Sequence, residues 1–237
     1  MHTFYTPAPA LPVHTLEGEE AEHAVRVLRV RPGDRVECVD GRGGRYLGAV
    51  EEVTKRTCSL RLDAPVVEPA LTPALVLVVA PTKSTDRFEW MLEKATELGV
   101  SAVQPVWTAR SERRQEKLDR WERILIAAMK QSRQAYLPEL RPAVAFTAWC
   151  TGPDAAAAPG YIAHCMPGTK PHLLAAVCAA GTTSAGWVAI GPEGDFTAEE
   201  VAAAESAGAV AVSLGTTRLR TETAGVAAVH AFRLAAV

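Results

Sequence analysis

The stretch Trp187-Val-Ala-Ile-Gly191-Pro192-Glu193-Gly194-Asp195-Phe-Thr197-Ala-Glu-Glu200 joins an apolar segment, a glycine-rich turn and the beginning of a helix. Its first four residues are continuously apolar, as in a strand that is buried on both faces. Thr197 and Glu200 have the spacing of a capping box, which predicts a helix start. Ligands of parallel sheets bind beyond the carboxyl ends of the strands, where glycines let backbone groups come close. The stretch predicts an α/β fold with a binding loop here; a tight turn without a ligand is the alternative.

A second loop of the same kind follows the next predicted strand, residues 209–214. Leu214-Gly215 is followed by charged and hydroxyl side chains, from Thr216 to Thr223, at the start of the last predicted helix. Neighbouring parallel strands end at the same edge of a sheet, so the two loops are expected to share one crevice.

Strands and helices alternate from residue 74 onward. The predicted strands are 74–79, 100–107, 161–164, 187–190 and 209–214. A helix is expected from Asp86, where Glu89 completes a candidate capping box, to Gly99 at its C′ position. Further helices are predicted at 117–135, 172–180, 198–207 and 222–236, with a loop at 152–160. This alternation predicts an α/β domain with a mostly parallel sheet and helices on both faces.

The chain before a proline-rich linker at 64–73 has a different character. The segments 35–39, 45–53 and 58–62 are short and β-prone, and glycine-rich turns separate them. We therefore predict a small β-rich, barrel-like domain at residues 1–68 and the α/β domain at residues 73–237.

The composition restricts the class of protein. Of 237 residues, 48% are hydrophobic, which is enough for a core, and the net charge is −2. The five cysteines are scattered without a Cys-x-x-Cys pair, as expected for reduced thiols in the cytoplasm. We expect no signal peptide, no membrane span and no metal site, because the characteristic segments and histidine spacings are missing. There is also no phosphate-loop motif, and Gly41-Arg-Gly43-Gly44 lies in the β-rich part, where a hairpin is expected.

Arginine and lysine are unevenly distributed along the chain. One cluster comprises Arg26, Arg29, Arg31, Arg35, Arg42 and Arg45, and the other comprises Arg110, Arg113, Arg114, Lys117, Arg120, Arg123, Lys130 and Arg133. Most of the second cluster lies off the apolar face of the predicted helix 117–135, so it is expected to face solvent or a ligand. The planar guanidinium group of arginine can bind phosphate with its fork of donors and can stack on bases with its flat face. A merely solvated surface is the alternative for both clusters.

Three motifs in order, Gly191–Gly194, Leu214-Gly215 and Leu219–Ala224, resemble the knotted (SPOUT) RNA methyltransferases. They are most similar to the bacterial family that methylates N3 of a uridine in small-subunit (16S) ribosomal RNA. Further matches lie along nearly the whole chain: His23, Val27–Arg29, Gly33-Asp34, Asp40-Gly41, Lys83, Glu89, Lys94-Ala95, Glu97–Val100, Arg110-Ser111, Gln131–Arg133 and Pro138.

The resemblance implies a PUA-like RNA-binding domain, a C-terminal trefoil knot, a homodimer, S-adenosylmethionine as the cofactor and ribosomal RNA as the partner. In the presumed crevice, Arg220 and Glu222 are the catalytic candidates: Arg220 could stabilise charge on the uracil carbonyl oxygens or anchor a phosphate, and Glu222 could accept the N3 proton. The alternative for Glu222 is that it simply occupies the N-terminus of the last helix, where negative charge is favoured. The implied cofactor-binding residues are His164, Gly191, Pro192, Glu193, Gly194, Leu214, Gly215, Leu219, Thr221, Thr223 and Ala224. The implied RNA-binding residues are His23, Arg26, Arg29, Lys83, Arg110, Arg113 and Arg133.

The chain departs from the family pattern at two places. Asp195 stands where glycine is commonest, and Thr217-Arg218 stands where an arginine followed by an aliphatic residue is usual. Two other functions stay open at this point. The chain could methylate another RNA, such as transfer RNA or large-subunit RNA, because fold does not decide substrate. It could also be a ribosome-assembly protein that binds RNA without catalysis.

Overall fold

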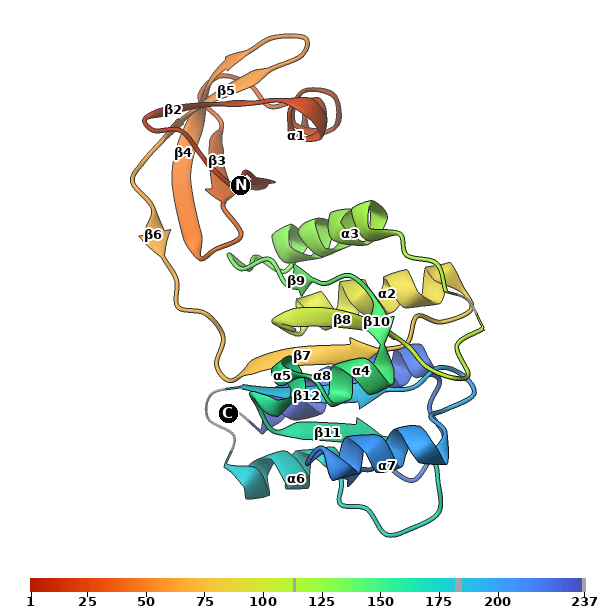
Figure 1. The fold of residues 1–237 in the computed structure, drawn as a ribbon. Coiled ribbons are helices and arrows are strands. Elements are labelled where there is room, and N and C mark those ends of the chain that lie inside the picture. Colours follow the sequence, from red (N-terminus) through yellow and green to blue (C-terminus); the bar gives the residue numbers. More distant parts are fainter. Residues whose placement is uncertain (113, 182–184, 236–237) are drawn as a thin grey trace. The chain divides into compact units, whose positions relative to one another are not determined.

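The computed structural model describes residues 1–112, 114–181 and 185–235. They form two compact units (Figure 1): the first contains residues 1–70 and 129–137, and the second contains 71–128 and 138 onward. The break at residue 70 lies inside the proline-rich linker. No sequence pattern indicated that residues 129–137, in the middle of the α/β region, pack with the N-terminal strands. None of the helices in the described ranges has the length and apolar character needed to cross a membrane.

The first unit is a curled β-sheet built around a hydrophobic core. Its strands are β1 (His2–Tyr5), β2 (Val13–Leu16), β3 (Arg35–Val39), β4 (Gly44–Val53), β5 (Cys58–Leu62) and β6 (Val66–Val67). Their order is β1-β3-β4-β5-β2, with β6 also paired to β4. Phe4 and Leu16, from the two edge strands, share one core with Val36 and Leu60. Helix α1 (Gly18–Glu22) and the π-helix η1 (His23–Leu28) were both missed from sequence, and they contribute Ala21 and Ala24 to that core. The predicted β-rich domain is confirmed.

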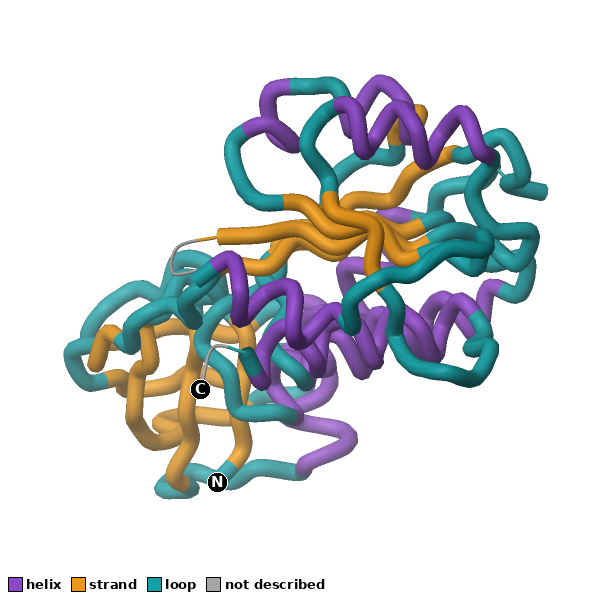
Figure 2. The backbone as a smooth tube through the Cα atoms, turned by 90° about the horizontal axis from the view of Figure 1, so that it is seen from below, coloured by secondary structure: helices purple, strands orange, loops and turns teal. Residues whose placement is uncertain are grey.

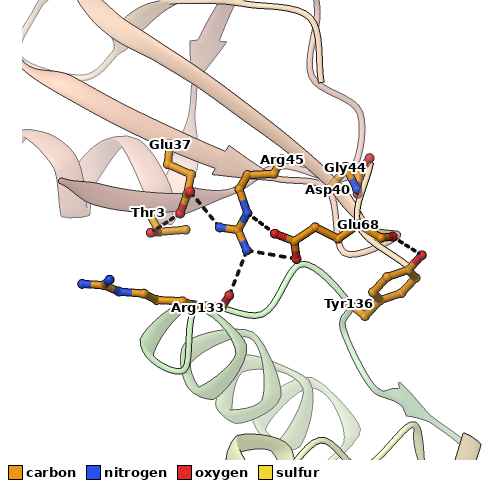
Figure 3. Close-up of polar contacts among 8 residues, drawn as sticks. All are labelled: Thr3, Glu37, Asp40, Gly44, Arg45, Glu68, Arg133 and Tyr136. Atoms are coloured by element: carbon orange, nitrogen blue, oxygen red, sulfur yellow. Dashed lines mark hydrogen bonds and ion pairs between the residues drawn. The ribbon is translucent and has the colours of Figure 1, made fainter. Parts of the chain in front are cut away.

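Arg45 on β4 connects three segments of this unit (Figure 3). Its guanidinium lies 2.7 Å from Glu37 on β3 and 2.7 Å from Glu68 in the linker, and it donates to the carbonyl of Arg133 at 2.8 Å. The hydrogen bond to Glu68, followed by that to Glu37, raises the pKa of Arg45 above its usual range. Glu37 is 5% exposed, and its other oxygen accepts from the Thr3 hydroxyl at 2.8 Å. Arg45, a member of the first arginine cluster, is therefore engaged inside the protein.

Residues 129–137 complete the first unit. Met129 and Ala135 are buried beside Val39, and the Gly43 N–H donates to the Ala135 carbonyl at 3.0 Å. Helix α3 (Leu118–Gln131) ends four residues earlier than expected, because Arg133 adopts a left-handed backbone with φ of 56°. This turn sends the chain back along the β-sheet.

The second predicted cluster is less solvated than expected. Arg120 on α3 donates to Glu89 at 2.6 Å, and Lys130 pairs with Glu20. The prediction that this face of α3 is displayed was wrong at Lys130, whereas Arg120 remains 55% exposed beside its partner, as predicted.

The second unit is a parallel sheet. Its strands are β7 (Ala74–Val79), β8 (Ala102–Trp107), β9 (Glu139–Leu140), β10 (Val144–Ala145), β11 (Gly160–Ala163), β12 (Ala185–Ile190) and β13 (Val210–Val212). The order is β10-β8-β7-β12-β11-β13, with β9 beside β8, and every pair is parallel. Its helices, besides α3, are α2 (Thr85–Glu97), α4 (Phe146–Cys150), α5 (Pro153–Ala156), α6 (Leu173–Ala180), α7 (Ala198–Ser206) and α8 (Thr221–Leu234). Helices cover both faces of the sheet (Figure 2), which confirms the predicted fold class.

The two faces of this sheet are packed differently. On one face, α4 and α7 enclose a core with Phe146, Trp187 and Phe196. On the other face, α8 packs against α2, α6 and strands β7 and β12. Gly225 permits this approach, because a Cβ there would lie 2.4 Å from the sulfur of Met91 on α2. A glycine inside a helix costs about 1 kcal/mol relative to alanine, so close packing must offset that cost.

Two predicted helix starts have different outcomes. The capping box at Thr197 is confirmed: its hydroxyl accepts from the Glu200 N–H at 3.2 Å, and Glu200 accepts from the Thr197 N–H at 2.9 Å. The capping box at Asp86 was wrong, because α2 begins after Ser84 and Glu89 is used by Arg120. At the other end of α2, Gly99 has a φ of 86°, as predicted for a C′ glycine.

The chain makes a long return before its last helix. Strand β13 is at the edge of the sheet, whereas α8 packs against β7 and β12 near its middle. Residues 213–220 therefore carry the chain back past the carboxyl ends of β11 and β12. A knotted topology requires such a return.

Replacing Arg45 by methionine should lower the free energy of unfolding of the first unit by about 2–4 kcal/mol, because Glu37 would keep a buried charge without its partner. Native-state amide exchange of β3 and β4 would measure the change. Arg61→Met is the matched control, since Arg61 pairs with Glu51 on the surface and exposed pairs contribute about 0–1 kcal/mol. Equal losses of unfolding free energy in both variants would show that the Arg45 contacts stabilise the unit no more than a surface ion pair does.

Candidate functional site

A cavity of about 1010 Å³ lies at the carboxyl ends of β11, β12 and β13, within the second unit. Three loops form most of its wall: residues 164–170 after β11, residues 191–197 after β12, and residues 213–220 before α8. Residues 191–197 are called the glycine loop below. Arg87 on α2 and Arg110 after β8 complete the wall. The two loops singled out in the sequence do share one crevice.

Most of the residues expected to bind cofactor or act in catalysis line this cavity. They are His164, Gly191, Pro192, Glu193, Gly194, Leu214, Gly215, Leu219, Arg220, Thr221, Glu222 and Ala224. Thr223 is not among the lining residues. Their roles stay predictions, but the fold brings the residues together.

The residues expected to contact RNA are spread over both units. Arg110 lines the cavity, and Lys83 follows β7. His23, Arg26, Arg29 and Arg133 belong to the first unit, and Arg113 lies outside the described residues. Arg26 pairs with Glu22 one helical turn away, yet its side chain stays 68% exposed.

Three side chains tie the glycine loop to the loops that follow other strands. Glu193 accepts from the backbone N–H of Lys83, after β7, at 2.9 Å. Arg110, after β8, donates to the carbonyls of Gly194 at 2.7 Å and Phe196 at 3.2 Å. The third is Asp195, one of the two departures from the family pattern. Its carboxylate accepts from the N–H of Cys165, after β11, at 2.7 Å and from the N–H of Phe196 at 2.8 Å.

The backbone explains why Asp195 fits at a position where glycine is commonest. Its φ is 64°, in the left-handed region that glycine adopts freely and that aspartate tolerates better than most residues.

The glycines of this loop serve its own packing. A Cβ on Gly191 would lie 3.1 Å from the ring and the backbone nitrogen of Phe196, and one on Gly194 would lie 3.2 Å from Arg110. Sequence reasoning assigned both glycines to close approach by a ligand, which overlooked these neighbours. At Gly215 the requirement is conformational, since its φ is 133°.

His164 has a defined protonation state. Burial and, second, the nearby charge of Lys170 lower the pKa of His164, so its ring is neutral at pH 7. Its Nδ1 accepts from the N–H of Met166 at 3.2 Å, which places the ring proton on Nε2. That Nε2 is buried and meets no hydrogen-bond partner among the described residues. Buried polar groups are nearly always satisfied, so this donor is an exception that calls for an explanation.

Glu222 lies near the start of α8 and is 8% exposed. Its carboxylate is 3.7 Å from the Nε of Arg87 on α2. The close approach at Gly225 and Met91 brings the first turns of the two helices side by side. The ion pair therefore joins the start of α8 to α2 beside the cavity.

Arg218 and Arg220 supply free positive charge. Both are exposed and line the cavity, and their side chains make no hydrogen bond or ion pair within the part of the chain that the structure describes. They are available to a phosphate or to a carbonyl oxygen that gains negative charge.

Sequence reasoning missed part of the wall: Arg87, Ala163, Cys165, Met166, Lys170, Val212 and Ser213. Ile190, Asp195, Thr216, Thr217 and Arg218 lie in the two stretches that it singled out but were given no role as binding residues. The residues after β11 could have been found by the same rule that identified the other loops, because residues 161–164 were predicted as a strand. Arg87 could not, because its place depends on how closely α8 approaches α2.

Comparison with known proteins agrees with this architecture. A family model for an RNA methyltransferase domain matches residues 70–233, and one for an RNA methyltransferase PUA domain matches residues 16–63. The ribosomal RNA small subunit methyltransferase E of Mycobacterium bovis is 31% identical over 92% of this chain and 85% of its own length. The Bacillus subtilis protein of the same name is 28% identical over 93% and 89%.

Solved structures show the same fold. A probable rRNA methyltransferase from Porphyromonas gingivalis is similar with a TM-score of 0.87, 33% identity, and coverage of 99% of this chain and 98% of that one. The ribosomal RNA small subunit methyltransferase E of Neisseria gonorrhoeae, solved with S-adenosyl methionine, has a TM-score of 0.85 and 28% identity, with coverage of 99% and 97%. The resemblance drawn from the motifs is confirmed, and the chain belongs to the RNA methyltransferase family that includes these ribosomal RNA small subunit methyltransferases E.

Proposed function

We propose that this protein transfers the methyl group of S-adenosylmethionine to N3 of a specific uridine in small-subunit ribosomal RNA. One observation supports this proposal most strongly. The motifs that resemble the methyltransferase family are far apart in the chain, yet they line one cavity at the carboxyl ends of the strands. We also infer from the resemblance that the protein acts as a homodimer in the cytoplasm, on ribosomal RNA or the small subunit.

The cavity fits the cofactor in size and in chemistry. Its volume of about 1010 Å³ is at the upper end of the range of small-molecule sites. The unsatisfied Nε2–H of His164 is a donor that a polar ligand would use. Backbone groups of Gly191 and of residues 214–219 would hold the adenine. When bound, S-adenosylmethionine supplies an electrophilic methyl group on a sulfonium.

The protein's own residues must handle a proton on the substrate. Uracil N3 is a poor nucleophile while it carries its proton, so the site must stabilise the anion or accept the proton. Arg220, free at the cavity wall, would stabilise charge on the uracil carbonyl oxygens. Glu222, held at the wall by Arg87 and the start of α8, would accept the N3 proton.

RNA recognition would begin on the first unit, which carries exposed arginines on η1 and after α3. Arg133 is exposed, and the bond from Arg45 to its carbonyl fixes the backbone that carries it. Phosphate contacts of this kind give affinity and orientation, whereas base contacts at the cavity would select the uridine.

The intact protein should bind S-adenosylmethionine in calorimetry, with no added metal and no effect of a chelator. No group of three or more potential metal ligands gathers within the described ranges. His164→Ala should weaken binding by about tenfold, the effect of one hydrogen bond to a buried donor. His230→Ala, on the exposed side of α8, is the control and should bind normally. Absence of binding by the unchanged protein would refute the proposed function.

Glu222→Gln should lower turnover by about 100-fold or more while cofactor and RNA affinities hold, as expected for loss of a general base. Raising the pH should restore part of the rate, because more of the uridine is then ionised. Glu199→Gln is the control, since Glu199 occupies the same second helical position on α7 but is exposed. Near-normal turnover of Glu222→Gln at neutral pH would remove Glu222 as the base and leave Arg220 and positioning to carry the reaction.

Arg26→Gln and Arg133→Gln should each reduce the slope of log affinity for ribosomal RNA against log salt by about 0.7–0.9, the loss of one phosphate contact. Titrations at several salt concentrations would measure it. Arg61→Gln, a surface change on β5, should leave the slope unchanged. Unchanged slopes in all variants would show that these arginines are merely solvated.

A further inference from the structure

We propose that Asp195 is a positioning residue that fixes the loop after β11, residues 164–170, in the shape in which the cavity accepts its cofactor. This inference rests on the proposed function, because it concerns the same cavity. Asp195 is half-buried, and its two carboxylate oxygens have separate tasks: one accepts from Phe196 inside the glycine loop, and the other accepts from Cys165 in the loop after β11.

The loop after β11 is anchored at its two ends by different means. At its far end, the Ser213 N–H donates to the Pro171 carbonyl and the Leu173 N–H donates to the Ser213 carbonyl, both at 2.9 Å. Near its beginning, just after β11 ends at Ala163, the 2.7 Å bond to Asp195 joins it to the glycine loop. The bonds that Met166 and Lys170 make with His164 stay inside the loop. They give it internal shape but no fixed place against the glycine loop.

Through its hydrogen bond with the Cys165 N–H, Asp195 also holds the backbone of the neighbouring residue His164 in place. The Cys165 N–H belongs to the peptide group that begins with the carbonyl of His164, so holding it fixes the backbone next to the histidine. The Nε2–H of His164 is buried without a partner among the described residues and has a fixed tautomer. A donor of this kind contributes most to affinity when it is already in place, because ligand binding then does not have to order it.

The backbone of Asp195 makes a selective test feasible. At a φ of 64°, glycine replaces aspartate without strain, so Asp195→Gly removes both hydrogen bonds and leaves the turn intact. Glu193 and Arg110 would still hold the glycine loop to the loops after β7 and β8. The variant therefore releases the loop after β11 while the rest of the wall stays in place.

The experiment uses the full chain with two readouts. In the unliganded protein, Asp195→Gly should speed amide exchange at Cys165 by about tenfold, as expected when a charge-assisted hydrogen bond is lost. In calorimetry, it should bind S-adenosylmethionine about tenfold more weakly, because ligand binding must then order the loop. In turnover assays, KM for the cofactor should rise while kcat at saturation stays the same.

Two further variants sharpen the test. Asp195→Asn tolerates the left-handed backbone and keeps one acceptor oxygen, so it should fall between wild type and Asp195→Gly in both readouts. Asp154→Asn removes an equal charge on α5, outside the cavity lining, and should behave like wild type.

The outcomes separate this proposal from the one that precedes it. Unchanged exchange at Cys165 in Asp195→Gly would overturn the positioning role, and so would faster exchange with unchanged cofactor affinity. A fall in kcat of about tenfold with an unchanged KM would also overturn the positioning role, because that result would indicate a role of Asp195 in the chemical step. A wild-type chain that binds no S-adenosylmethionine would overturn both proposals. Weaker cofactor binding in the Asp195 variants alone would leave the proposed function intact.

Discussion

The glycine loop is held by ionised side chains rather than by apolar packing alone. Glu193, Arg110 and Asp195 tie it to three loops that follow β7, β8 and β11. Each bond joins a charged group to a backbone N–H or carbonyl, and such bonds are shorter and stronger than those between neutral groups. Loops at the carboxyl edge of a parallel sheet have no hydrogen-bonded ladder of their own. The side-chain hydrogen bonds connect these loops instead. The cavity keeps its shape because the bonds fix four loops against each other.

Arginine has two distinct uses in this chain, and sequence alone did not separate them. Arg45 and Arg110 both came from clusters that suggested RNA, yet both donate to groups within the fold. The side chains of Arg218 and Arg220 meet no partner within the described residues and leave two positive charges available at the cavity. The difference depends on acceptors far away in the chain. Glu68 and the carbonyl of Arg133, which bind Arg45, lie 23 and 88 residues from it.

Local patterns were sufficient where local interactions decide the structure. Strands 35–39, 58–62 and 74–79 have the bounds expected, because alternation or continuous apolar character marks them directly. The capping box of α7 formed because Thr197 and Glu200 satisfy each other. The one proposed at Asp86 did not, because Glu89 has a partner 31 residues away. The pairing of Arg87 with Glu222 likewise depends on two helices meeting at Gly225, which no local signal contains.

The first unit consists of two separate segments of the chain, and this has a consequence for its folding during synthesis. Residues 1–70 leave the ribosome long before residues 129–137 are made, and domains generally fold in the order in which they emerge. Until then, Val39 lacks the cover of Met129 and Ala135, and Arg45 lacks the carbonyl of Arg133. The nascent N-terminal sheet must therefore wait, with part of its core exposed to water, until Ala135 has been made, 65 residues after Ala70 (135 − 70). Its closure depends on a segment that is synthesised between two parts of the second unit.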